Sequence, residues 1–147
     1  MNLDQLEVWR LARDFAVALY KDVLPLLPAS EKYNLADQLK RAASSIPANI
    51  AEGHGRFYFQ DNVRFCYIAR GSLTEVQSHI SLPKELGFIT PEVYTNTTRP
   101  AETVARSING LITYLKKAKI GMNEPGAAHA VYEPQSPNPA EFLTEKD

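Results

Sequence analysis

Six polar residues between Gln38 and Arg56 recur at intervals of three or four, so a helix would stack them along one side. They are Gln38, Arg41, Ser45, Asn49, Glu52 and Arg56. A helix face that only has to be solvated needs charge and helix propensity, whereas this polar stripe combines two arginines, a carboxylate, a hydroxyl and two amides. Its composition suits hydrogen bonding to a partner, but it defines no reaction.

Metal binding and nucleophilic catalysis find little support in the residue pattern. His54, His79 and His129 lie on unrelated segments, and no pair has the i, i+4 spacing of two helical metal ligands. Cys66 lies in an apolar run, where an inert buried thiol is expected. We therefore predict no metal site, no cofactor and no catalytic nucleophile.

Carboxylate chemistry and a phosphate cradle are also disfavoured. Glu52 and Glu75 could face each other across two helices. The basic residues Arg41, Arg56 and Arg70 are candidate partners for these carboxylates, which favours an ion-pair network over acid–base catalysis. The segment 53–56, Gly-His-Gly-Arg, follows a predicted helix instead of opening one, so the helix dipole has the wrong direction for an anion. This segment is interpreted as a helix stop, and the protein is predicted not to be an enzyme.

The basic residues form a candidate nucleic-acid surface, with Phe57 and Tyr58 nearby for stacking on bases. The candidate surface comprises Lys40, Arg41, Arg56, Arg64 and Arg70. The same side chains could instead be solvated, paired with acids, or used to hold subunits together. The sequence leaves both interpretations open.

Composition indicates one globular domain of a cytoplasmic protein. Hydrophobic residues make up 44% and charged residues 22% of 147 residues, which is enough for a core without a disulfide or metal. The single cysteine suits a reducing compartment. No secretory signal is visible, and no apolar run approaches the roughly 18 residues of a membrane span.

Charge divides the chain into two parts. Residues 1–120 carry 15 Lys and Arg against 12 Asp and Glu, a net of +3. Residues 121–147 carry one Lys against five acids and contain four prolines. We predict a folded domain over 1–120 and a Pro-rich, acidic, flexible tail over 121–147, because the tail has too little apolar surface to offset the entropy of ordering.

Apolar periodicity predicts four helices and no strand. The first runs from about 3 to 24, the second from an N-cap at Ser30 to about 52, and the third from about 59 to 86. The fourth starts at Thr90, which precedes a proline and an acid, and runs to about 120. The fold class is therefore all-α: an up-down-up-down antiparallel four-helix bundle with a disordered C-terminal tail.

Three prolines interrupt these predicted helices. Pro47 should free the carbonyl group of Ala43 and bend the second helix. Pro83 should kink or split the end of the third helix, and Pro100 should divide the fourth near Arg99.

The third helix is apolar on nearly every side over residues 65–69. A helix of this kind must be covered all round, either by one wide core-facing surface or by a second surface buried between subunits. The second alternative makes Phe65, Tyr67 and Ile68 candidate oligomer-interface residues.

Residues 40–56 read KRAASSIPANIAEGHGR, which resembles the signature of the four-helix bundle proteins encoded within 23S ribosomal RNA intervening sequences. The segments LEVW at 6–9 and YIARGSLTEV at 67–76 agree with the same family. The resemblance implies a small cytoplasmic bundle that forms a ring of five subunits and has no settled activity. A more remote relative, the accessory protein of diversity-generating retroelements, has a similar bundle and binds nucleic acid.

These observations lead to two functional hypotheses. The first is a non-enzymatic homo-oligomeric scaffold, a pentamer by resemblance, that presents the polar stripe to RNA or DNA. The second is a protein–protein adaptor in which the stripe builds the oligomer and binds no nucleic acid. A membrane partner is not expected.

Overall fold

The computed structural model describes residues 2–119. Within them lie four α-helices and no strand, as predicted. The helices are α1 (Glu7–Asp22), α2 (Leu35–His54), α3 (Phe59–Glu85) and α4 (Pro91–Ala118). Three single 3-10 turns accompany them at Leu3–Gln5, Leu24–Leu26 and Ala29–Glu31. The tail predicted for 121–147 lies outside the described residues.

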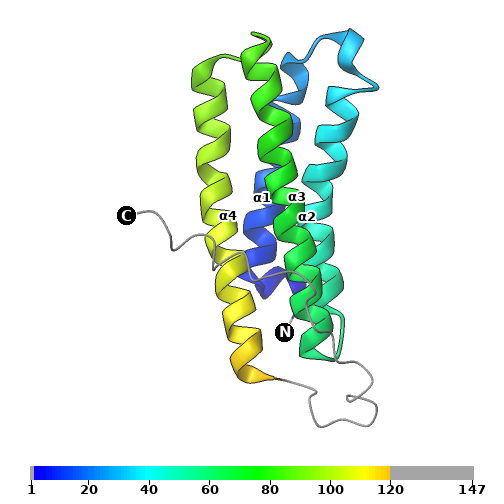
Figure 1. Cartoon of the computed structure of the whole chain (residues 1–147), viewed down its shortest axis with the longest axis vertical. Helices are drawn as coiled ribbons and strands as arrows, with labels where there is room; N and C mark the ends of the chain where they lie inside the picture. Colours follow the sequence, from blue (N-terminus) through cyan, green and yellow to red (C-terminus); the bar gives the residue numbers. More distant parts are fainter. Residues whose placement is uncertain (1, 120–147) are drawn as a thin grey trace.

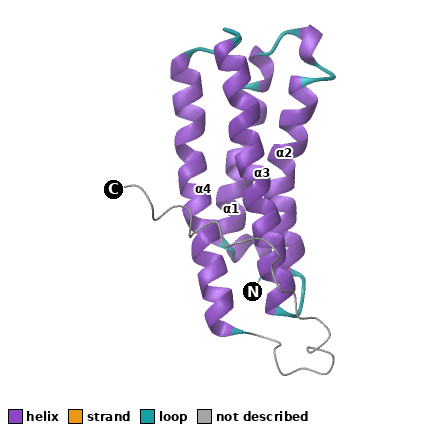
Figure 2. Cartoon of the chain, in the orientation of Figure 1, coloured by secondary structure: helices purple, strands orange, loops and turns teal. Residues whose placement is uncertain are grey.

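Successive helices run in alternate directions and form one up-down-up-down bundle (Figure 1). Each helix packs against the next along the chain, and α1 closes the bundle by packing against α4. Short loops join α2 to α3 and α3 to α4, and a longer connection with two 3-10 turns joins α1 to α2 (Figure 2). As a result, the α2–α3 loop, the end of α4 and the start of the described chain all lie at one end of the bundle.

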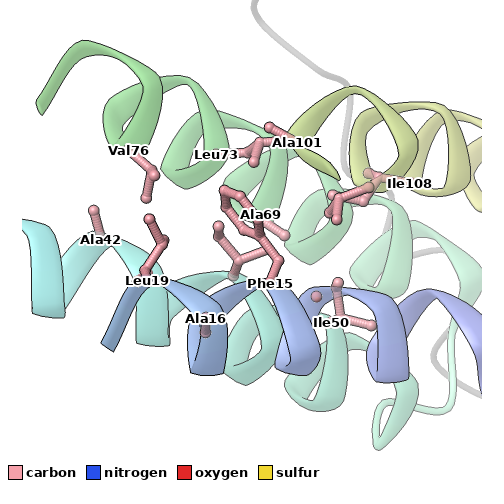
Figure 3. Close-up of a cluster of buried hydrophobic side chains, with 14 of the residues drawn as sticks. Phe15, Ala16, Leu19, Ala42, Ile50, Ala69, Leu73, Val76, Ala101 and Ile108 are labelled. Carbon is pink, nitrogen blue, oxygen red and sulfur yellow. The ribbon is translucent and has the colours of Figure 1, made fainter. Parts of the chain in front are cut away.

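The core consists of the apolar stripes of all four helices (Figure 3). The largest aliphatic side chains that are fully buried are Leu19, Leu39, Ile46, Ile50, Leu73, Ile80 and Ile108. Between them lie fully buried alanines at positions 12, 43, 69 and 101. Alternating large and small side chains let the helices approach closely without leaving voids.

Capping side chains define the starts of α2 and α4, and one of the two predicted N-caps is wrong. Thr90 caps α4 as predicted, because its Oγ1 accepts a hydrogen bond from the backbone N–H of Val93 at 3.1 Å. The predicted N-cap at Ser30 is wrong, since the chain first makes a 3-10 turn there and α2 begins after Asn34. The Glu31 carboxylate accepts a hydrogen bond from the free backbone N–H of Leu35 at 3.4 Å.

The prolines do not divide their helices. Helix α3 continues through Pro83, and α4 continues through Pro100, so the predicted division of α4 near Arg99 is wrong. A proline removes one backbone hydrogen bond, while the turns on either side of a long helix keep theirs. Pro83 is buried near the end of α3, and its carbonyl group accepts a hydrogen bond from the N–H of Phe88 at 2.9 Å.

A matched pair of leucine substitutions tests this core. Leu39→Ala should lower the free energy of unfolding by about 2–5 kcal/mol, because the side chain is only 1% exposed and its removal leaves a cavity. Leu82→Ala removes the same atoms from a side chain that is 48% exposed and should cost less than about 1 kcal/mol. Urea unfolding followed by circular dichroism measures both, and equal costs would contradict this assignment of the core.

Candidate nucleic-acid interface

The middle of the polar stripe joins α2 to α3. The hydroxyl groups of Ser45 and Ser72 are hydrogen-bonded at 2.8 Å. The side-chain amide of Asn49 donates to both the carbonyl oxygen and the hydroxyl oxygen of Ser45, each at 2.8 Å. These groups are partly buried, so the bonds satisfy polar atoms inside the bundle. Ser72, which the sequence analysis did not single out as a site residue, completes the network.

The basic residues of α2 form ion pairs within their own helix. Arg56 lies 2.8 Å from the carboxylate of Glu52, which was a predicted partner. Arg41 lies 3.1 Å from Asp37, one turn earlier, and its side chain is 80% exposed. Exposed i, i+4 pairs of this kind stabilise a helix only slightly, so these arginines keep their freedom to bind another anion. Lys40 makes no ion pair within residues 2–119.

The serine pair also fixes how Glu52 and Glu75 are placed. The helices are antiparallel, so moving from Ser45 to Glu52 and from Ser72 to Glu75 goes in opposite directions. The backbone positions of the two residues therefore lie about 15 Å apart along the bundle axis, too far for their carboxylates to meet. The expectation that they face each other is wrong, and Glu75 instead lies 4.0 Å from the imidazole of His79 on its own helix.

Gly53 lets α3 approach the last turn of α2. A Cβ atom at this position would lie 2.7 Å from Oδ1 of Asn62 and 2.9 Å from Cβ of Phe65. Both distances are shorter than van der Waals contact, so only glycine fits without a shift of α3. Phe65 is thereby held beside α2, with the guanidinium carbons of Arg56 and Arg64 at 5.2 Å and 6.0 Å from its ring centre.

Arg70 lies on a different side of α3, facing α4. Its Nη1 donates to Oδ1 of Asn109 at 2.7 Å, and its guanidinium carbon lies 4.9 Å from the ring centre of Tyr67. Lys116 of α4 donates to the hydroxyl oxygen of the same tyrosine at 2.9 Å. Two half-buried cations therefore converge on one ring. The sequence analysis did not include Lys116 among the site residues, because nothing in the sequence indicates that the end of α4 lies beside Tyr67.

The α2–α3 loop helps to form a cavity of about 510 Å³ at the end of the bundle. Four of the ten lining residues are phenylalanine or tyrosine, and the lining comes from the end of α2, the loop, the first turn of α3 and the end of α4 together with Leu6. The lining residues are Leu6, His54, Arg56, Phe57, Tyr58, Phe59, Asn62, Leu111, Tyr114 and Leu115. The sequence indicated Phe57 and Tyr58 as stacking residues. It gave no signal that Tyr114, more than 50 positions away, lines the same cavity.

The structure also bears on the Cys66 thiol, on metal binding and on membrane insertion. Burial raises the pKa of the Cys66 thiol to about 12, which removes its nucleophilic thiolate at neutral pH. No group of three or more potential metal-binding side chains gathers anywhere in residues 2–119. Of the helices in that same range, none combines the length and apolar character needed to cross a membrane.

The proposed interface residues thus form three groups along α2 and α3. Ser45 and Asn49 belong to the α2–α3 contact, Arg56 and Arg64 lie over Phe65, and Arg70 lies over Tyr67. Of the candidate oligomer residues, Phe65 and Tyr67 are half-buried, and Ile68 is 40% exposed. The run 65–69 therefore extends beyond the core face that Cys66 and Ala69 occupy.

The fold and these side chains define an antiparallel four-helix bundle with arginine and lysine groups packed on aromatic rings. The model of the 23S rRNA-intervening sequence protein family matches residues 4–110, and the chain belongs to this family. A solved protein of unknown function from the S23 ribosomal protein family of Bacteroides thetaiotaomicron superposes with a TM-score of 0.66 at 23% identity. The match covers 71% of this chain and 97% of that one, and it establishes the fold alone. No curated protein matches the chain.

The burial of Cys66 has a direct chemical consequence. In the folded protein a disulfide reagent should label this thiol about a thousandfold more slowly at pH 8 than in urea, because almost no thiolate is present. The native rate should still rise between pH 8 and pH 10, a range in which an ordinary thiol approaches its plateau. Absorbance of the released thiol measures the rate, and rapid labelling of native protein would contradict the buried position.

Proposed function

We propose that this protein is a non-enzymatic helical scaffold that binds the sugar–phosphate backbone of nucleic acid. The binding surface follows α3 from the end of α2 to α4, and its cations are Arg56, Arg64, Arg70 and Lys116. The observation that carries the proposal is the pairing of all four cations with aromatic rings, and of Arg70 and Lys116 with neutral hydrogen-bond partners. Interleaved basic and aromatic side chains are typical of surfaces that bind single strands.

Arg70 and Lys116 provide the strongest part of this surface. Both are half-buried, and neither contacts a carboxylate within residues 2–119. Their hydrogen-bond acceptors, the Asn109 amide and the Tyr67 hydroxyl, orient the cationic groups but neutralise no charge. A phosphate oxygen is the acceptor that would complete such a pair with a charge-assisted hydrogen bond.

Assembly into a homo-oligomer would strengthen a weak surface. The exposed side chain of Ile68 lies on the part of α3 that faces away from the core, next to the half-buried Phe65 and Tyr67. In this proposal a second copy covers Ile68 and leaves the cations beside the Phe65 and Tyr67 rings open. The family resemblance suggests five copies. Several identical surfaces on one particle multiply modest affinities through avidity. The second candidate function, a protein–protein adaptor, uses the same assembly without nucleic acid.

A pair of charge-neutralising double variants tests nucleic-acid binding. Arg70→Gln with Lys116→Gln should weaken binding of a single-stranded RNA or DNA. It should also make the log–log salt dependence shallower by about 0.7 for each phosphate group that the protein no longer neutralises. Lys21→Gln with Arg99→Gln removes the same charge from exposed positions on other faces and should change neither property. Fluorescence anisotropy over a salt series measures both.

Three results would count against the nucleic-acid proposal. Equal effects in the two double variants would indicate a general charge effect. Unchanged binding in the first would mean that Arg70 and Lys116 face no phosphate. Absence of any salt-sensitive binding by an assembled protein would favour the adaptor.

Light scattering tests the assembly. The purified protein should have a mass several times 16.4 kDa at micromolar concentration. Ile68→Glu should lower that mass, because it places a charge on the surface that a second copy covers. The matched variant Leu82→Glu, at another exposed position of α3, should leave the mass unchanged. A monomeric wild-type protein would contradict assembly, and an unchanged mass in Ile68→Glu would contradict this interface.

A further inference from the structure

We infer that the cavity at the α2–α3 end of the bundle receives one unpaired nucleobase of the bound strand. This inference rests on the proposed function and assigns a specific ligand to a cavity that phosphate binding alone does not explain. It also implies that single strands are bound in preference to duplexes, because a paired and stacked base cannot enter.

The size and walls of the cavity suit a flat aromatic ligand. Its volume of about 510 Å³ falls within the usual range for sites that hold small organic groups. Phe57 on the loop and Tyr114 on α4 line it and are 57% and 59% exposed, so each ring is accessible to a ligand. Figure 1 shows the loop and the end of α4 at the same end of the bundle. Rings from two separate elements thus offer stacking surfaces to an incoming base.

Polar groups inside the cavity match the edge of a base. Oδ1 of Asn62 accepts a hydrogen bond from the Cys66 thiol at 3.6 Å, whereas its amide nitrogen donates no hydrogen bond within residues 2–119. That N–H₂ group is therefore available to a carbonyl or ring nitrogen acceptor, such as a base presents. The hydrogen bond from Cys66 orients the Asn62 side chain, and the absence of a Cβ atom at Gly53 leaves room for its Oδ1. His54 adds a second polar group to the lining.

Charge connects the cavity to the proposed backbone surface. Arg56 both lines the cavity and lies over the ring of Phe65, where Arg64 also lies. A base inserted among the aromatic rings brings its own phosphate to the cavity mouth, next to the Arg56 guanidinium. A purely apolar ligand would make no hydrogen bond to the Asn62 amide and no charge interaction with Arg56, whose exposed pair with Glu52 is weak enough to be exchanged for a phosphate. The combination of stacking walls, a hydrogen-bond donor and a neighbouring cation therefore favours a nucleotide.

Fluorescence of the base analogue 2-aminopurine within a short single-stranded oligonucleotide tests base insertion with the wild-type protein. Stacking in the cavity should quench the fluorescence on binding. An oligonucleotide of abasic sites with the same number of phosphates should bind about tenfold more weakly. Phe57→Leu and Tyr114→Leu should each reduce the quenching and the affinity for the base-containing strand, but leave the salt dependence unchanged. Tyr33→Leu removes an 86% exposed ring that is not part of the cavity and serves as the matched control.

The failures of the two proposals are distinguishable. If the strand binds with a steep salt dependence but its fluorescence is not quenched, and the abasic strand binds equally well, base insertion is overturned while phosphate binding stands. If neither strand binds, both proposals are overturned. Equal reductions in Tyr33→Leu and in the two cavity variants would also overturn the assignment of the cavity.

Discussion

The close approach of α3 to α2 is the constraint on which the candidate site depends. Gly53 permits this approach because a Cβ atom there would overlap Asn62 and Phe65. The hydrogen bond between Ser45 and Ser72 fixes the register of the two helices two turns away. The positions of Phe65, of the arginines over its ring and of the cavity wall all follow from this one contact.

Polar side chains in the bundle fall into two energetic classes. Ser45, Asn49 and Ser72 are hydrogen-bonded to one another at the partly buried α2–α3 contact. A polar group left without a hydrogen bond there would lower the free energy of unfolding. The exposed pair of Arg56 with Glu52 is worth at most about 1 kcal/mol, because solvent screens both charges. Stability therefore depends on the buried neutral network and the apolar core, and the exposed cations are left for other interactions.

Sequence reasoning succeeded where one helix alone carries the signal. Apolar periodicity predicted the four helices and their buried faces, and the Thr90 cap was predicted from local chemistry. It failed at Ser30, because a capping residue cannot indicate whether a 3-10 turn or the helix itself follows. It also failed for the division of α4 at Pro100, since the intact turns on both sides keep a long helix continuous.

The sequence by itself determined the helices, their apolar stripes and the Thr90 cap, because these depend on residues within a few turns of one another. Only the tertiary structure decided which polar residues share a surface. It brought Lys116 to Tyr67, brought Tyr114 to the α2–α3 loop and separated Glu52 from Glu75. The physical reason is that helix register and rotation are set by packing between elements, which no periodicity within a single helix encodes.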